Sequence, residues 1–98
     1  MFRDFFLGFI KIHILFHASE GPIYGVGIME EIRRHGYHVS PGVIYPILSS
    51  LEKQEFLKSS EKVVQGKVRK YYEITEKGRN MLEESKKKIR ELVEEVLK

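Results

Sequence analysis

The sequence has no cysteine and no tryptophan among its 98 residues. The absence of cysteine excludes disulfide bonds and thiolate metal sites, and it favours a reducing, cytoplasmic compartment. Long apolar runs are also nearly absent, because the run from Phe5 to Ala18 is interrupted by Lys11, His13 and His17. That run falls short of the roughly 20 residues that cross a bilayer, so we expect no membrane-spanning segment and no signal peptide.

The sequence also lacks a large excess of charge of one sign. Its formal net charge is +3 at pH 7, which is too small to indicate nucleic-acid binding by itself. The basic residues are locally concentrated, however, since five of them lie from Lys58 to Tyr71 against the single acidic residue Glu61. Such a run is either the solvated surface of a hairpin or a surface that binds phosphates.

Residues 1–18 predict a helix that is apolar around most of its circumference. One side of this helix carries Phe2, Phe5, Phe9 and Phe16. A chain of 98 residues can cover only part of such a helix with its own core. We therefore expect the phenylalanine side to contact a second copy of the chain, and a helix wrapped wholly by its own domain is the alternative.

The next segment predicts two short helices joined by a tight turn. The first covers residues 24–34, and Gly36 follows it as a C-cap glycine would. The second begins at Ser40, a good N-cap residue, with Pro41 at the first helical position. An apolar stripe on this second helix faces a core and consists of Ile44, Ile47, Leu48 and Leu51. The pair forms a helix-turn-helix pattern.

The outer face of the second helix suits contact with DNA. Its side chains are small, polar or basic, and none is a carboxylate, as a helix lying against phosphates requires. Pro46 removes one helical hydrogen bond, which is a cost that needs a functional reason. The candidate DNA-binding residues on this helix are Ser40, Gly42, Tyr45, Pro46, Ser49 and Lys53.

After Phe56 the apolar pattern changes from a helical period to an alternating one. Two β-favouring runs flank Gln65 and Gly66, which predicts a hairpin. A hairpin beside a helix-turn-helix can act as a wing whose cations contact the DNA backbone. The candidate contacts on the wing are Lys67, Arg69 and Lys70.

Residues 75–98 predict a last helix with Thr75 as its N-cap. Its apolar residues form a narrow seam with a seven-residue recurrence, and most other positions are Glu or Lys. This seam suits packing against a helix of a second copy. The seam residues that we assign to dimerisation are Leu82, Ile89, Leu92, Val93 and Val96.

The motifs SPGxxYPxL at 40–48 and RKYYxxT at 69–75 closely resemble those of the PadR family of transcriptional regulators. The resemblance covers roughly residues 5–82, and the single last helix is similar to the short subgroup of that family. It implies a mainly helical (α+β) winged helix-turn-helix with long N-terminal and C-terminal dimerisation helices. It divides the chain into a first helix (1–18), a helix-turn-helix with its wing (19–74) and a dimerisation helix (75–98).

The resemblance also implies a function, namely a homodimeric repressor that binds pseudo-palindromic operators in double-stranded DNA. The hydroxyl of Tyr45 would then contact a phosphate, and Pro46 would hold the chain close to the groove. Family members often take a small hydrophobic effector between the first and last helices, and Phe5, Phe9 and Phe16 either line such a space or pack as core. One departure from the family is Glu55, where a glycine is common.

Other classes of function have weaker support. A winged helix that binds another protein, without specific DNA binding, is the main alternative. An enzyme is disfavoured because no acid, base and nucleophile converge, and no cofactor is expected. His13 and His17 are four residues apart and could share a metal ion, but the sequence offers no third ligand, so packed or solvated histidines are expected. His35 and His38 flank the turn and are expected at the surface.

Overall fold

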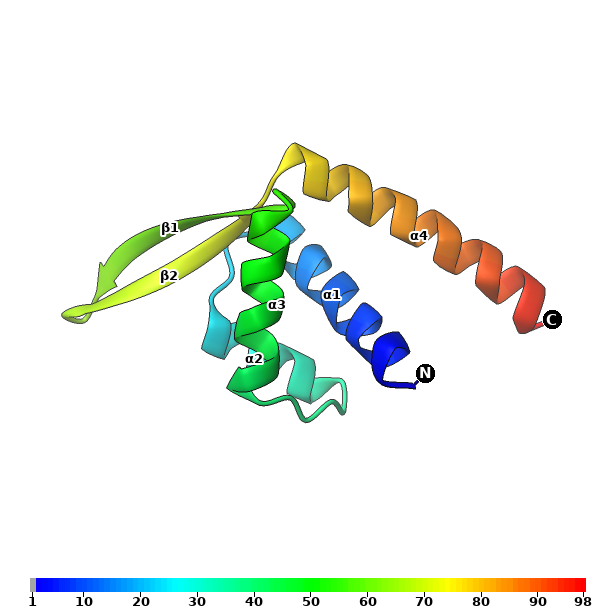
Figure 1. Ribbon diagram of the computed structural model, residues 1–98, viewed down its shortest axis with the longest axis horizontal. Helices are drawn as coiled ribbons and strands as arrows, with labels where there is room; N and C mark the ends of the chain where they lie inside the picture. The colour runs from blue at the N-terminus through cyan, green and yellow to red at the C-terminus, as the bar shows by residue number, and fades with distance from the viewer. Residues whose placement is uncertain (1) are drawn as a thin grey trace.

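The computed structural model describes residues 2–98 and places three helices, a two-stranded sheet and a fourth helix in that order (Figure 1). The elements are α1 (Phe2–Glu20), α2 (Gly25–Arg34), α3 (Pro41–Lys53), β1 (Leu57–Val64), β2 (Lys67–Ile74) and α4 (Glu76–Val96). This order confirms the predicted mainly helical fold with a helix-turn-helix and a wing. Met1, where the predicted first segment begins, lies outside the described residues, and α1 continues two residues beyond the predicted 1–18.

The core lies between α1, α2 and α3 and is closed by the base of the hairpin. Ile10 and Ile14 of α1 and Ile32 of α2 are fully buried. The predicted apolar stripe of α3 is confirmed, since all of its members are buried: Ile44, Ile47, Leu48 and Leu51. At the wing base, Leu57, Tyr72 and Ile74 complete the same cluster.

The prediction that Leu82 belongs to the dimerisation seam is wrong. Its side chain is 3% exposed, because the first turns of α4 lie against the core of the same chain. Gly78 enters the same contact, and a Cβ added to it would lie 2.2 Å from the carbonyl oxygen of Phe56. The apolar positions of α4 from Ile89 onward are exposed.

Both helices of the helix-turn-helix end in a residue with positive φ. Gly36 follows α2 with φ +89°, and Glu55 follows α3 with φ +65°. Hydrogen bonds from Glu55 N to Glu52 O and from Phe56 N to Leu51 O, both 2.9 Å long, complete a Schellman motif at the end of α3. Glu55 therefore has the left-handed conformation that a glycine would adopt at this helix end, although it carries a side chain.

The N-terminal caps differ between α3 and α4. Thr75 caps α4 as predicted, with its Oγ1 accepting a hydrogen bond of 2.9 Å from Gly78 N. Ser40 occupies the predicted N-cap position of α3, but its side chain makes no capping hydrogen bond. The start of α3 therefore depends more on Pro41, whose fixed φ suits the first helical turn.

The wing is an antiparallel hairpin whose pairing runs from Leu57 opposite Ile74 to Val64 opposite Lys67. Its two turn residues, Gln65 and Gly66, both have positive φ, as the turn that joins two twisted strands tightly requires. The base is fixed by two further hydrogen bonds between Ile23 and Tyr72, of 2.9 and 2.7 Å. These bonds attach the base of the wing to Ile23, which lies two residues before α2.

The molecule is elongated, with extents of 52 × 29 × 20 Å. The wing and α4 project to opposite sides of the bundle formed by α1, α2 and α3 (Figure 1). Within residues 2–98, no helix has the length and apolar character needed to cross a membrane.

Candidate nucleic-acid interface

A groove of about 710 Å³ separates the wing from the helix-turn-helix. Tyr45 and Ser49 line it from α3, while Lys67, Arg69 and Lys70 line it from β2. The sequence predicted all five of these residues as DNA contacts, and the structure brings them to one surface. The groove therefore combines an exposed helix face with a cluster of cations.

The outer face of α3 continues along the helix on both sides of these two residues. Gly42, Pro46 and Lys53 share the exposure of Tyr45 and Ser49, at helical spacings of three and four residues. Pro46 cannot donate to the carbonyl of Gly42, yet α3 continues unbroken to Lys53. Ser40 is exposed at the start of the helix. This face is free of carboxylates from Ser40 to Ser49.

Tyr45 lies close to the first residue of α2. A Cβ added to Gly25 would lie 2.5 Å from the Tyr45 hydroxyl, so glycine leaves room for the ring in its present position. The Tyr45 side chain is nevertheless 44% exposed. Gly25 therefore allows α2 and α3 to approach closely while the tyrosine still faces the groove.

Arg69 is held by an aromatic pair that sequence reasoning did not find. Its guanidinium carbon lies 4.2 Å from the centre of the Tyr24 ring, and Tyr24 meets Tyr71 edge to face at 5.6 Å. A hydrogen bond to Tyr71 is the first cause of the raised pKa of Arg69. A guanidinium that stacks on a ring through its face keeps its N–H donors available to other groups. Tyr24 thus orders Arg69 across the gap between α2 and the wing.

Lys70 has a different environment from Arg69. Its Nζ lies 3.4 Å from a carboxylate oxygen of Glu52 on α3. A hydrogen bond from Ser59 is the main reason that the pKa of Glu52 is lowered, and Lys70 adds to that effect. A Coulombic interaction with the hydroxyl group of Tyr72 is the first cause of the raised pKa of Lys70. Lys70 therefore joins the wing to α3, and a phosphate would compete with Glu52 for it.

Three cations of the wing have no such partner. Over residues 2–98, no carboxylate oxygen lies within 4.0 Å of the charged nitrogens of Lys62, Lys67 or Arg69. Lys58, at the base, is 3.9 Å from Glu73. The free positive charge of the wing is thus concentrated toward its tip and the groove.

The remaining residues predicted for dimerisation are exposed apolar side chains. Phe2, Phe5, Phe9 and Phe16 of α1 range from 36% to 80% exposed. Ile89, Leu92, Val93 and Val96 of α4 range from 36% to 64% exposed. Their exposure leaves two apolar surfaces, one on each long helix, without cover from the chain itself.

Similarity to known proteins covers most of the chain. Residues 14–84 match the model of the transcriptional regulator PadR-like family. The chain is 41% identical over 95 residues to the transcriptional regulator Rv3488 of Mycobacterium tuberculosis, which covers 97% of this chain and 89% of that protein. A PadR-like transcriptional regulator of Bacillus cereus is 33% identical with a TM-score of 0.79, covering 93% of each chain.

The fold is also that of PadR of Bacillus subtilis, whose structure was solved in complex with operator DNA. The TM-score is 0.70 at 23% identity, over 76% of this chain and 44% of that one.

Proposed function

Because this chain belongs to the PadR-like family of transcriptional regulators, we propose that it represses transcription as a homodimer on a pseudo-palindromic operator. It is a transcriptional regulator and not an enzyme. The observation that carries the proposal is the groove in which the outer face of α3 meets Lys67 and Arg69. The operator complex of B. subtilis PadR, which has the same fold, supports the choice of double-stranded DNA as the partner.

In this proposal, α3 is the recognition helix. The major groove of B-DNA, about 12 Å wide, admits one α-helix. Tyr45 and Ser49 present hydroxyl groups to the duplex, and Gly42 and Pro46 let the backbone of α3 come close. Lys53 adds a cation near the end of the helix. These five residues would fix the position of α3, and their side chains, where present, would contact the base edges and phosphates that it meets.

The wing supplies the part of the affinity that does not depend on sequence. Lys67 and Arg69 would neutralise phosphates beside the site of α3 and displace counterions from them. Lys70 would contribute less, since it already pairs with Glu52. Because stacking on Tyr24 already restricts the Arg69 side chain, less conformational entropy would be lost when Arg69 binds DNA.

The exposed surface of the chain supports a homodimer. Its accessible area is 7020 Å², whereas a compact monomer of 11.5 kDa exposes about 5,800 Å². Its radius of gyration is 14.3 Å, against about 12.6 Å for a compact chain of this length. Covering the apolar faces of α1 and α4 with a second copy would bury part of this excess and place two copies of α3 on two half-sites.

The same interface would hold a small hydrophobic effector. Phe5 and Phe9 lie edge to face with ring centres 4.8 Å apart, and both rings are partly exposed. An effector between α1 and α4 would change the spacing of the two copies of α3. A regulator of this kind works where the chromosome is, so we place it in the cytoplasm.

The test is the binding of the full chain to a labelled DNA fragment from upstream of its own gene, compared with a scrambled fragment of equal length. We expect at least tenfold preference for the upstream fragment. The affinity should fall steeply with salt, with a log–log slope of about −0.9 for each phosphate contacted. The doubly substituted variant Lys67→Ala with Arg69→Ala should lose affinity for both fragments. Lys87→Ala, on the exposed side of α4, is the matched control and should bind normally.

Two outcomes would contradict the proposal. Equal, weak binding to both fragments, for every upstream region tested, would mean that the groove binds DNA without sequence specificity. A folded dimer that binds no DNA at low salt would favour the alternative, a winged helix that binds another protein.

A further inference from the structure

Three of the four histidines of the chain come together where α1 passes the end of α2. His13 and His17 lie one turn apart on α1, and His35 is the C-cap residue of α2. One ring nitrogen from each histidine lies within 4.8 Å of the other two. The ring centres of His13 and His35 are 4.7 Å apart. The fold thus supplies the third imidazole that the sequence did not reveal.

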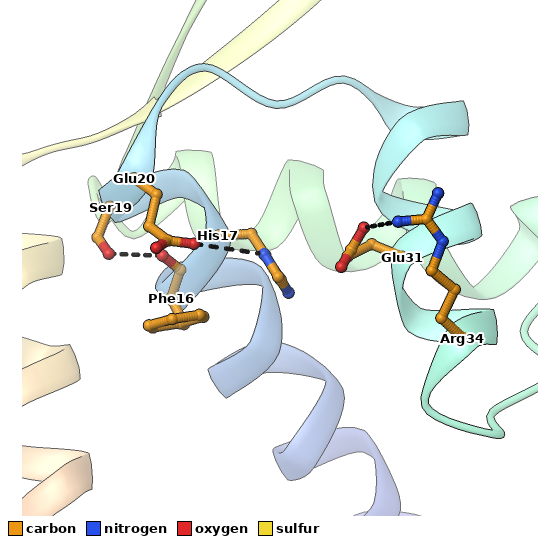
Figure 2. Close-up of polar contacts among 6 residues, drawn as sticks. All are labelled: Phe16, His17, Ser19, Glu20, Glu31 and Arg34. Atoms are coloured by element: carbon orange, nitrogen blue, oxygen red, sulfur yellow. Dashed lines mark hydrogen bonds and ion pairs between the residues drawn. The ribbon is translucent and has the colours of Figure 1, made fainter.

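A carboxylate stands beside this cluster. The Nδ1 atom of His17 faces a carboxylate oxygen of Glu20 at 3.9 Å, and its other ring nitrogen points away from Glu20 (Figure 2). A histidine ligand usually directs one ring nitrogen to a metal and the other to a carboxylate or carbonyl. Glu20 is therefore placed to fix the orientation of His17.

The guanidinium of Arg34, the residue before His35, is paired with a carboxylate. Arg34 donates to Glu31 at 3.0 Å, and Glu31 lines the same pocket as His17 (Figure 2). Burial, followed by the neighbouring His35 and His17, lowers the pKa of His13. The neutral form of an imidazole is the form that binds metals. His13 and His17 are half-buried and His35 is exposed, so an ion from solvent can reach all three.

We propose that His13, His17 and His35 form a binding site for a divalent transition-metal ion of the zinc class. Imidazole ligands suit Zn²⁺, Co²⁺, Ni²⁺ and Cu²⁺ rather than Ca²⁺ or Mg²⁺. With bonds of about 2.1 Å, the ligand nitrogens of a tetrahedral site lie about 3.4 Å apart. The three nitrogens, which lie within 4.8 Å of one another, would move closer together on binding, and water would occupy the fourth position.

The ion would join two elements that the sequence separates. His13 and His17 belong to the helix that carries the apolar dimer surface, and His35 belongs to the turn that leads into α3. None of the three lines the groove beside the wing, so the ion would act on the arrangement of the helices and not on DNA directly. Its binding can therefore be tested without DNA.

The test is competition between the full chain and a chromophoric chelator for Zn²⁺, with the visible spectrum of bound Co²⁺ as a measure of geometry. We expect one ion per chain and an intense, tetrahedral Co²⁺ spectrum. Each of His13→Gln, His17→Gln and His35→Gln should weaken Zn²⁺ binding at least tenfold. His38→Gln changes the one histidine outside the cluster and should leave the affinity within twofold.

A second measurement separates loss of a ligand from loss of folding. Zn²⁺ should raise the melting temperature of the unsubstituted chain and of His38→Gln, but not of the three cluster variants, all compared with their values in EDTA. Glu20→Gln should weaken binding by less than the loss of a ligand. The proposal is overturned if a variant that carries His13→Gln, His17→Gln and His35→Gln together binds Zn²⁺ as tightly as the unsubstituted chain, or if His38→Gln loses as much affinity as the cluster variants.

Discussion

The wing and α4 both project from the core, and both expose apolar side chains, yet they suit different partners. At the tip of the wing, Val63 and Val68 are paired across the strands and are 73% and 67% exposed. The next pair on the same face is Glu61 with Lys70, and the polar turn follows on the other side, so the valines form no continuous apolar surface. On α4 the exposed Leu92 and Val96 belong to a seam that continues along the helix. The spacing of exposed apolar residues, and not their number, therefore distinguishes a helix-binding surface from a DNA-binding one.

The largest effect is expected from a substitution in the α4 seam, which tests whether this seam binds a second copy of the chain. Leu92→Lys places a charge where the proposed dimer buries a side chain from each copy. Loss of two leucine contacts, each of about 1.5–3 kcal/mol, predicts at least a hundredfold weaker dimer. Sedimentation equilibrium measures this change, and Glu91→Gln, beside the seam, is the control. A dimer of unchanged affinity would show that α4 does not form the interface.

The next effect concerns the root of α4. Gly78→Ala places a Cβ 2.2 Å from the carbonyl oxygen of Phe56. Overpacking of this kind costs about 1–3 kcal/mol, which outweighs the gain of about 1 kcal/mol from the helix propensity of alanine. We expect a lower free energy of unfolding in urea. Gly8→Ala, in open space on α1, is the matched control and should be neutral or stabilising.

Two neighbouring cations of the wing, Arg69 and Lys70, test its proposed role in DNA binding. Arg69→Ala should weaken DNA binding by about fivefold to tenfold on every sequence and reduce the salt slope by about one unit. Lys70→Ala should have a smaller effect, because Lys70 is paired with Glu52. Fluorescence anisotropy over a range of salt concentrations measures both. A change of base preference in Arg69→Ala would contradict its role as a phosphate contact.

The smallest effect is expected at the joint between α3 and the wing. Glu55 has φ +65°, which a residue with a Cβ adopts at some cost. Glu55→Gly should therefore stabilise the chain by about 0.5–1 kcal/mol, measured by urea denaturation. Gly36→Ala makes the reverse change at the end of α2 and should destabilise it by a similar amount. A destabilised Glu55→Gly variant would mean that the side chain makes contacts that outweigh its backbone strain.

Local signals in the sequence were sufficient for the elements of the fold. The stripe from Ile44 to Leu51 has a helical period, and Gln65 with Gly66 marks a hairpin turn. These features depend on residues that are close together in the chain. The same kind of reasoning located the exposed face of α3 and the cations of the wing.

Contacts between distant residues could not be predicted in this way. A seven-residue recurrence places Leu82 and Ile89 on one side of α4, but it does not say where the core of the chain ends. The stacking of Arg69 on Tyr24 and the approach of His35 to His13 depend on how α2 lies against its neighbours. For the histidines, one available signal was the position of His35 at the end of a helix that had to lie beside α1.

The connection between the wing and α4 has a mechanical consequence. β2 ends at Ile74 and α4 begins at Glu76, so Thr75 alone joins them. Its hydroxyl donates to the carbonyl of Glu55, and its N–H donates to the carbonyl of Phe56. Because both groups are hydrogen-bonded to the residues that follow α3, Thr75 has little rotational freedom. The hairpin and α4 should therefore move together as one rigid unit. In the proposed dimer, any change in the angle at which two copies of α4 cross would be converted directly into a change in the span between the two wings.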